Sequence, residues 1–213
     1  DREAVYIEQV LEPLRRRFEG LRVVLEHVTT ADAIEYVHSA ATGLAATITP
    51  HHLLINRNAI FRGGINPHMY CLPVAKRERH RQALRDAATS GDIRFFLGTD
   101  SAPHLRSDKE TDCGCAGIFN APTAISSVVQ VFEEEGALSR VEEFTSKNGA
   151  KFYGLPENTD QIVVQKSVPS DQAQWTVPVG DDQVQVFLPE GSLAWKIVGG
   201  LRRPTSQVRE LTG

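Results

Sequence analysis

The stretch Ile93-Arg94-Phe95-Phe96-Leu97-Gly98 is a short, largely apolar run that leads directly into a long polar loop. Such a run is typical of a strand that is buried on both faces. Two similar runs precede it, at residues 21–28 and 44–49, and both contain small or β-branched residues. We therefore predict three buried strands, each followed by a loop or turn and then by a helical pattern.

Helical patterns alternate with the three predicted strands. Gly20, Gly91 and Gly136 follow three of these patterns and are typical helix stops. Strands that alternate with helices form a parallel sheet with the helices outside it, so the predicted fold class is α/β. Helices are predicted over residues 3–18, from Thr29 or Thr30 to Ser39, and over residues 74–90, 122–135 and 141–153.

The pattern changes beyond Asn158, where short strands lie among prolines and glycines. We interpret residues 159–198 as a small β-rich appendage and residues 199–213 as a loosely ordered tail. The strands of the appendage are predicted at residues 161–164, 183–188 and 193–198.

The composition is that of an ordinary globular protein, since 41% of the 213 residues are hydrophobic and 23% are charged. The net charge of −4 argues against a nucleic-acid partner, and no apolar run approaches the ~20 residues of a membrane helix. An odd number of cysteines without a signal peptide predicts a reducing compartment, the cytoplasm. The chain opens at Asp1 without an initiator methionine, so we expect a fragment or a processed chain.

Two polar residues stand at the carboxyl ends of predicted strands. His27 ends the first strand, and Asp100 follows the third. In parallel α/β barrels this end of the sheet is the active face, and an imidazole with a carboxylate suits a divalent metal such as zinc. Taken alone, each residue has an ordinary alternative: a structural histidine that is hydrogen-bonded locally, and an aspartate that forms a turn.

Two long loops, residues 50–73 and 99–120, follow the second and third strands, and loops of this length are usually functional. His51 and His52 come directly after a strand and are interpreted as loop-packing residues. The remaining polar residues of note are predicted to be solvated: His38 and His80 on helices, and Asp108, Lys109, Glu110 and Asp112 in a charged loop.

Five motifs resemble the bacterial type of dihydroorotase, in order and in spacing, from Asp1 to about Trp195. Two of them are specific to that family: Gly98-Thr99-Asp100-Ser101-Ala102-Pro103-His104 and Cys113-Gly114-Cys115-Ala116-Gly117. The others are Glu26-His27-Val28-Thr29-Thr30, Ala45-Ala46-Thr47-Ile48-Thr49-Pro50 and Tyr70-Cys71-Leu72-Pro73.

The resemblance implies a (β/α)8 barrel with two zinc ions that are bridged by a carboxylated lysine. It also implies the reversible cyclisation of N-carbamoyl-L-aspartate to L-dihydroorotate, a step of pyrimidine biosynthesis, in a homodimer. His27 matches a metal ligand, and Asp100 matches a residue that is both a metal ligand and the general acid/base. Leu72 and Ala116 match residues that contact the substrate through their backbone, and His104 matches a side chain that contacts the substrate carboxylate.

The chain also departs from the family pattern. It lacks the His-x-His pair, the bridging lysine and a further metal-binding histidine, together with the substrate-binding Arg and Asn of the early loops. We therefore expect residues 1–158 to hold only the last three strand–helix units of the barrel, and the 213-residue chain alone to be inactive. Two alternatives stay open, namely another cyclic amidase of the hydantoinase or allantoinase kind, and an inactive fragment or scaffold subunit.

Overall fold

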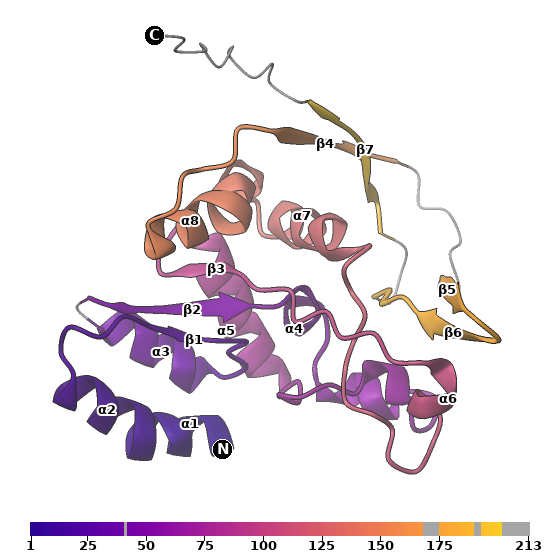
Figure 1. Ribbon diagram of the computed structural model, residues 1–213, viewed down its shortest axis with the longest axis horizontal. Coiled ribbons are helices and arrows are strands. Elements are labelled where there is room, and N and C mark those ends of the chain that lie inside the picture. Colours follow the sequence, from indigo (N-terminus) through magenta and orange to yellow (C-terminus); the bar gives the residue numbers. More distant parts are fainter. Residues whose placement is uncertain (41, 168–174, 190–192, 202–213) are drawn as a thin grey trace, which may run out of the picture.

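The computed structural model describes residues 1–40, 42–167, 175–189 and 193–201 of the protein (Figure 1). Its centre is a parallel sheet of three strands in the order β1 (Val23–Leu25), β2 (Leu44–Ile48) and β3 (Phe95–Leu97). In this sheet Leu25 pairs with Ala46, and Ile48 pairs with Leu97. The predicted α/β class and the three parallel strands are confirmed, although β1 and β3 are shorter than the apolar runs that predicted them.

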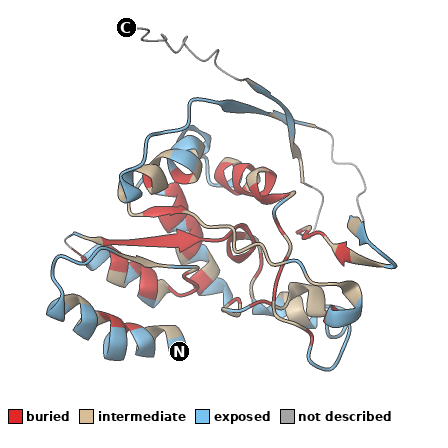
Figure 2. Cartoon of the chain, in the orientation of Figure 1, coloured by how far each residue is buried: buried red, intermediate tan, exposed pale blue. Residues whose placement is uncertain are grey.

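The middle strand lies in the core of the molecule. All five residues of β2 are buried, as Figure 2 shows by colour, and the face of the strand that carries Leu44, Ala46 and Ile48 packs on helices. α3 (Ala31–Ser39) connects β1 to β2, and α5 (Glu78–Thr89) connects β2 to β3. α7 (Ala124–Glu134) and α8 (Asn148–Tyr153) follow β3 and complete the cover. The largest fully buried side chains of the core include Phe95, Phe132, Phe144, Leu44, Ile48, Leu53 and Leu84.

The amino-terminal helix is continuous but changes its winding on the way. It consists of α1 (Arg2–Tyr6), a π-helical turn η1 (Ile7–Leu11) and α2 (Glu12–Arg17). Ile7 and Leu11 are its buried residues, and they join the main core. The predicted helix is confirmed.

Helix ends are set by local chemistry. Thr30 caps α3, because its hydroxyl accepts a hydrogen bond from the backbone N–H of Ala33 at 3.1 Å. Gly154 ends α8 with a positive φ of 68°, which a glycine adopts without strain. Two short elements join α7 to α8: a 3₁₀ turn η4 (Leu138–Arg140) and a π turn η5 (Glu143–Lys147).

The two long loops contain more helix than was predicted. Thr49 caps α4 (Pro50–Leu54), which has proline in its first turn, so His51 and His52 lie on a helix and not in an irregular loop. The rest of the first loop holds the 3₁₀ turns η2 (Arg57–Phe61) and η3 (Pro67–Met69), and the second loop holds α6 (Arg106–Lys109).

The carboxyl-terminal part consists of two antiparallel strand pairs. β4 (Gln161–Lys166) pairs with β7 (Trp195–Leu201), and β5 (Thr176–Val179) pairs with β6 (Asp182–Gln185). β5 had no counterpart in the sequence prediction. β7 packs on α7, where the indole N–H of Trp195 donates to Glu133 at 3.0 Å. The strand ends at Leu201, inside the segment expected to be a tail, and residues 202–213 lie outside the described residues.

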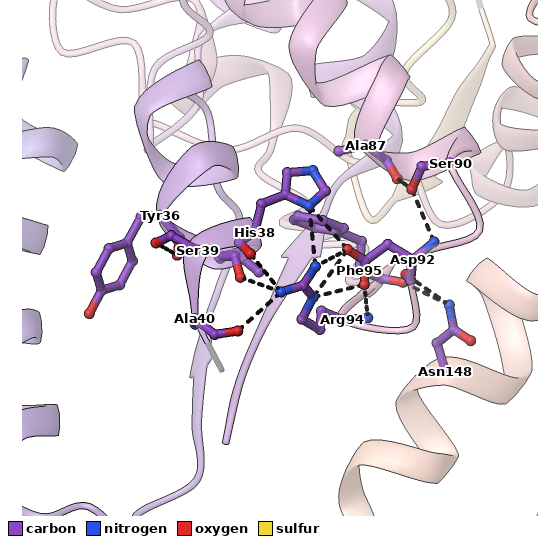
Figure 3. Close-up of polar contacts among 11 residues, drawn as sticks. Tyr36, His38, Ser39, Ala40, Ala87, Ser90, Asp92, Arg94, Phe95 and Asn148 are labelled. Carbon is purple, nitrogen blue, oxygen red and sulfur yellow. Dashed lines mark hydrogen bonds and ion pairs between the residues drawn. The ribbon is translucent and has the colours of Figure 1, made fainter. Parts of the chain in front are cut away.

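A polar cluster ties the amino-terminal end of the sheet together (Figure 3). The Nη1 of Arg94, just before β3, donates to the carbonyl oxygens of Val37 at 3.0 Å, His38 at 2.9 Å and Ala40 at 3.2 Å, at the end of α3. The same guanidinium pairs with Asp92 at 2.5 Å. This end of the sheet is opposite to the end that carries His27 and Asp100.

Among the described residues, no helix is long and apolar enough to cross a lipid bilayer.

Candidate active site

His27 is held at the end of β1 by the neighbouring strand. Its backbone N–H donates to the Thr47 hydroxyl at 2.7 Å, and the next amide, that of Val28, donates to the Thr47 carbonyl at 3.1 Å. The Nδ1 of His27 lies 3.4 Å from the same hydroxyl oxygen. With the proton on Nδ1, the lone pair of Nε2 is free to bind a metal ion. The residue has a positive φ of 56°, which is unusual for a side chain larger than glycine.

Asp100 lies at the equivalent position after β3 and has the same unusual backbone, with a φ of 43°. Two neighbours fix this turn. The side-chain amide of Asn120 donates to the carbonyl of Thr99 at 2.7 Å, and the hydroxyl of Ser101 accepts from the backbone N–H groups of Asn120 at 3.2 Å and Ala121 at 2.9 Å. The backbone around Asp100 is therefore held on both sides.

A glycine lets the two strand ends come close. A Cβ atom on Gly98 would lie only 2.6 Å from the Cβ of Thr47, which is closer than such atoms approach in proteins. Because Thr47 holds the backbone of His27 and Gly98 precedes Asp100 by two residues, the small residue brings the two polar strand ends together.

The imidazole of His27 and the carboxylate of Asp100 face each other. The Nε2 of His27 lies 3.9 Å from the Oδ1 of Asp100, and both side chains are partly exposed. Bonds of ~2.0–2.2 Å from nitrogen and oxygen to one zinc ion are compatible with this separation. The pair thus has the donor atoms and the spacing of two metal ligands. The carboxylate of Glu26 also lies 3.4 Å from the same nitrogen, but it is largely exposed.

Partial burial raises the pKa of Asp100 above its usual value, and the position of His27 opposes this shift while Glu26 adds to it. A carboxylate with a raised pKa is a stronger proton acceptor than an ordinary aspartate. Asp100 therefore has the electrostatic setting of a general base.

His104 and Ala116 also lie together. The Nε2 of His104 is 3.2 Å from the carbonyl oxygen of Ala116, and the imidazole lies directly on Gly117. A Cβ atom at position 117 would be 2.6 Å from the ring, so only glycine permits this contact. The side chain and the backbone segment that the sequence analysis assigned to the substrate carboxylate are thus neighbours.

Leu72 is an exposed residue in the loop that follows η3, with 60% of its surface accessible and a cis peptide bond to Pro73. It is linked to Ala116 indirectly. The backbone N–H of Gly117 donates to the carbonyl of Tyr70 at 3.0 Å, which joins the loop of Leu72 to that of Ala116.

Lys109 corrects the sequence analysis. It was predicted to be solvated, but it is only 3% exposed, and its ammonium group donates to three carbonyl oxygens in the loops that carry Leu72 and Ala116. Burial lowers the pKa of Lys109 to about 8, with Cys71 and Cys115 opposing the shift, so the amine is still largely protonated at neutral pH. Asp108, Glu110 and Asp112 are exposed as predicted.

His80 is a second correction. It was predicted to lie on the surface of a helix, but it is 5% exposed, and its Nδ1 accepts a hydrogen bond from the backbone N–H of Ala31 at 2.9 Å. The imidazole thus satisfies an amide at the start of α3. His38 is exposed as predicted.

His51, His52 and Cys71 form a buried group whose potential ligand atoms all lie within 4.8 Å of one another. Their hydrogen bonds indicate packing. His52 shares one ring nitrogen with the Thr49 hydroxyl at 2.8 Å and the other with the Pro73 carbonyl at 2.9 Å, so its N–H faces the carbonyl and no lone pair is free. Burial, with Asp100 adding to it, raises the pKa of the Cys71 thiol to about 12. We therefore assign the group to packing between α4 and the loop of Leu72.

Three residues of the site region were not predicted from the sequence, namely Thr47, Asn120 and Lys109. Thr47 lies inside a strand motif, and Asn120 precedes Pro122 in a context that is typical of a helix start. Lys109 lies between two acidic residues in a polar loop, a pattern that indicates solvation. None of the three is marked by a motif, because each forms its hydrogen bonds with backbone atoms whose positions depend on the folded loops and strands.

The model of the Amidohydrolase family matches residues 4–167. The chain belongs to the amidohydrolase family. Dihydroorotases are among the relatives of this amidohydrolase chain. It is 57% identical over 197 residues to one from Chelativorans sp. (strain BNC1), a match that covers 92% of this chain and 57% of the relative. A dihydroorotase from Synechococcus sp. (strain CC9605) is 59% identical over 200 residues, which cover 87% of this chain and 58% of the relative. The chain thus spans somewhat more than half the length of these curated relatives.

Solved structures agree with this family assignment. The amidohydrolase chain superimposes on dihydroorotase from Saccharomyces cerevisiae, in complex with 5-fluoroorotic acid, with a TM-score of 0.78 and 31% identity over 91% of this chain and 57% of that one. Dihydroorotase from Campylobacter jejuni gives a TM-score of 0.75 and 30% identity over 89% of this chain and 54% of that one. L-Hydantoinase from Arthrobacter aurescens, at 22% identity and a TM-score of 0.65 over 78% of this chain and 40% of that one, shares the fold. The resemblance to dihydroorotases noted in the motifs is confirmed.

Proposed function

We propose that the protein containing this chain is a zinc-dependent dihydroorotase, which interconverts N-carbamoyl-L-aspartate and L-dihydroorotate in pyrimidine biosynthesis. The observation that carries the proposal is the pairing of His27 with Asp100 at adjacent strand ends, 3.9 Å apart. The identity of 57% to a protein named dihydroorotase supports it, whereas the hydantoinase named above shares only 22%.

In this proposal the three parallel strands are the last three strand–helix units of a (β/α)8 barrel, within residues 1–158. Residues 159–198 form an appendage, and residues 199–213 form a tail. The carboxyl ends of barrel strands are where active sites of this architecture lie, which agrees with the positions of His27 and Asp100. A carboxylated lysine and further histidines from other strands would complete the metal centre.

His27 and Asp100 would hold zinc through one nitrogen and one oxygen atom. When bound, the metal pair lowers the pKa of a water molecule and polarises the ring carbonyl. Asp100 accepts the proton of the attacking water and delivers it to the amide nitrogen as the ring opens, and it reverses these transfers as the ring closes. The carboxyl must bind and release a proton in each cycle, and partial burial, which raises its pKa above the usual value, favours proton binding.

The substrate carboxylate that takes no part in the reaction would be held by His104 and by the backbone at Ala116, while Leu72 contacts the ring through its backbone. This arrangement separates a dihydroorotase from cyclic amidases whose substrates lack a carboxylate. The Nε2 of His104 lies 3.2 Å from the carbonyl oxygen of Ala116, so the two residues are neighbours. Because a carboxylate only accepts hydrogen bonds, it would be held by N–H donors of these residues and not by this carbonyl.

The remaining parts of the proposal rest on the resemblance. The substrate is a small molecule, and the complete enzyme is a homodimer of the cytoplasm. Sedimentation of the purified protein tests the dimer.

The test of the function is an assay of ring opening and ring closure with the intact protein that carries this chain, together with its zinc content. His27→Ala should remove one metal position and abolish turnover, because a rigid strand-end ligand is lost. His38→Ala, an exposed imidazole on α3, is the matched control and should keep both the zinc and the rate. A parent protein that opens unsubstituted hydantoin rings but not dihydroorotate would contradict the proposal.

A further inference from the structure

Lys109 is a buried lysine whose ammonium group is surrounded by hydrogen-bond acceptors. Its Nζ donates to the carbonyl oxygens of Cys115 at 2.6 Å, Gly117 at 2.8 Å and Tyr70 at 3.0 Å, and it lies 5.9 Å from the centre of the Tyr70 ring. Three protons are matched by three acceptors, which satisfies a buried ammonium group without a carboxylate partner.

The three acceptors belong to segments that the proposed function uses. Cys115 and Gly117 are the two residues that flank Ala116, so the ammonium group holds one carbonyl before Ala116 and one after it. Tyr70 precedes Leu72 by two residues. One side chain therefore connects the two backbone segments that are proposed to contact the substrate, and these segments come from different long loops.

The third substrate contact depends on the same anchor. His104 lies on Gly117, and a shift of that glycine would move the surface that supports the imidazole. Its Nε2 also lies 3.2 Å from the carbonyl of Ala116, between the two carbonyls that Lys109 binds. The positions of His104, Ala116 and Leu72 are thus coupled through one buried cation.

We propose that Lys109 is a positioning residue, which holds the loops of Leu72 and Ala116 in the arrangement that binds the substrate carboxylate. The inference rests on the proposed function for its substrate, and on the three hydrogen bonds for its mechanism. Lys109 acts through backbone carbonyls and touches no reacting atom. Its loss should therefore weaken substrate binding more than it slows the chemical step.

Lysine is chemically specific for this position. Its three N–H bonds spread from one nitrogen atom and can reach three carbonyls around it, whereas the donors of arginine lie in one plane and extend further. Methionine has a similar length but donates no hydrogen bond. Lys109→Met thus removes charge and donors, and Lys109→Arg keeps the charge but cannot reproduce the three contacts.

The experiment measures kcat and KM for dihydroorotate in the intact protein with Lys109→Met and Lys109→Arg. Both variants should raise KM about tenfold while kcat stays within about threefold, since a lost ground-state contact appears in KM. Lys151→Met, which changes an exposed lysine of α8, is the matched control and should leave both constants unchanged. If Lys109→Arg keeps the parental KM, charge and not positioning explains the residue, and the inference is wrong.

Hydrogen exchange gives a second measurement that needs no activity. In both variants, peptides covering residues 70–73 and 114–118 should exchange faster, because the Gly117 amide bonds to Tyr70 across the loops that Lys109 joins. Unchanged exchange in a folded variant would overturn the inference. If Lys109→Met does not fold, Lys109→Arg decides alone, since it keeps the buried charge and donors to neighbouring carbonyls.

The two proposals fail in different ways. A parent protein without turnover of dihydroorotate contradicts the proposed function, while the exchange measurement still tests the anchoring by Lys109. If the parent protein is active and KM is unaltered in both folded variants, only the inference about Lys109 is contradicted.

Discussion

At the scale of single residues, the strand-end pair is defined by backbone as much as by side chains. His27 and Asp100 both have positive φ angles, and Thr47 and Asn120 hold the backbone on either side of them. Hydrogen bonds to main-chain atoms therefore fix the positions of the two side chains of the pair. Substitutions of the side chain and of its support should have separable effects.

Asp100→Asn separates metal binding from proton transfer. Asparagine keeps one oxygen ligand and tolerates a left-handed backbone, but it cannot accept a proton at neutral pH. With this substitution, the intact protein should keep much of its zinc, and its kcat should fall by a factor of ~10²–10⁴ relative to the parent. Because Asp100 must be ionised to accept the proton, parental hydrolysis should fall at low pH, and this limb should flatten in the variant. His104→Ala is the contrasting variant, with an effect mainly on KM. Near-parental turnover of zinc-loaded Asp100→Asn would exclude Asp100 as the proton carrier.

Gly98→Ala tests the close approach of the two strand ends. The new Cβ would lie 2.6 Å from the Cβ and 2.9 Å from the Oγ1 of Thr47, and the Cβ of Thr47 cannot move without shifting β2. We expect a loss of roughly 1–3 kcal/mol in the free energy of unfolding, as for overpacked cores. Gly20→Ala is the matched control, because no heavy atom lies within 4 Å of its added Cβ. Equal urea midpoints for the two variants would show that the sheet accommodates the methyl group.

At the scale of elements, the end of α3 and the start of β3 are joined by one arginine. Arg94 donates to three carbonyls at the end of α3 and pairs with Asp92, whose pKa it lowers despite the opposing effect of burial (Figure 3). The carbonyls at a helix end have no partner within the helix, so the guanidinium replaces water there.

Arg94→Lys should weaken this junction without affecting the site. Lysine cannot bond the three carbonyls and both carboxylate oxygens at once, so we expect the free energy of unfolding to fall by roughly 1–3 kcal/mol. Arg79→Lys, at an exposed position of α5, is the control. Chemical denaturation measures the loss, and kcat of the folded protein should stay at the parental value. A decrease in kcat that matches the loss of stability would show that the two ends of the sheet are coupled.

The order of elements is predictable from the sequence because apolar runs and glycine stops mark it. Residues 93–98 and 44–49 are read as strands from their apolar content, and Gly91 and Gly136 mark helix ends with positive φ angles of 82° and 67°. β5 is not predicted, since Thr176-Val177-Pro178-Val179 contains a proline, which weakens a strand pattern. α4 is missed because two histidines after Pro50 have no helical periodicity.

The site is predictable only where its residues follow strands directly. His27 and Asp100 are identified by that position, and the structure brings them together. Lys109 is misjudged, because its neighbours in the sequence are acidic and exposed, while its partners are carbonyl groups further along its own loop and in the loop of Tyr70. Burial of a charged side chain depends on tertiary contacts, which local composition does not report.

At the scale of the whole molecule, the two ends of the parallel sheet differ in character. One end carries the strand-end pair and the long loops, and the other carries the Arg94 cluster and short connections. This separation is typical of α/β barrels, where the carboxyl ends of strands serve function and the opposite ends serve stability. The buried imidazoles of His51 and His52 lie on α4, which follows β2 at the first end, and their protonation should affect the stability of the whole fold.

Acidification should destabilise the protein through His51 and His52. Burial lowers the pKa of His52 from 6.5 to about 4 and that of His51 well below 6.5. The unfolded chain binds these protons first, so the stabilisation is complete above pH 6.5 and is lost as the pH falls from there toward 4. Titration of His52 alone should lower the free energy of unfolding by about 2 kcal/mol between pH 7 and pH 5.

Urea titrations of the metal-free protein at pH 7, 6 and 5 measure this dependence. His51→Gln and His52→Gln should each reduce the slope of stability against pH, whatever they do to stability at pH 7. Lys151→Gln, which changes an exposed lysine of α8, is the control and should keep the parental slope. A parental slope in all three variants would assign the pH dependence to other groups.

The positive φ angles of His27 and Asp100 have an evolutionary consequence. Glycine adopts this conformation freely, whereas a histidine is disfavoured there by about 1 kcal/mol and an aspartate by less. A population of variants selected only for heat resistance should therefore accumulate glycine at positions 27 and 100, and would lose both proposed metal-binding side chains in doing so. Selection for turnover should preserve the two strained residues. Selection for heat resistance and selection for catalysis thus favour different residues at these two positions. A consensus sequence built from thermostable variants alone would lack His27 and Asp100.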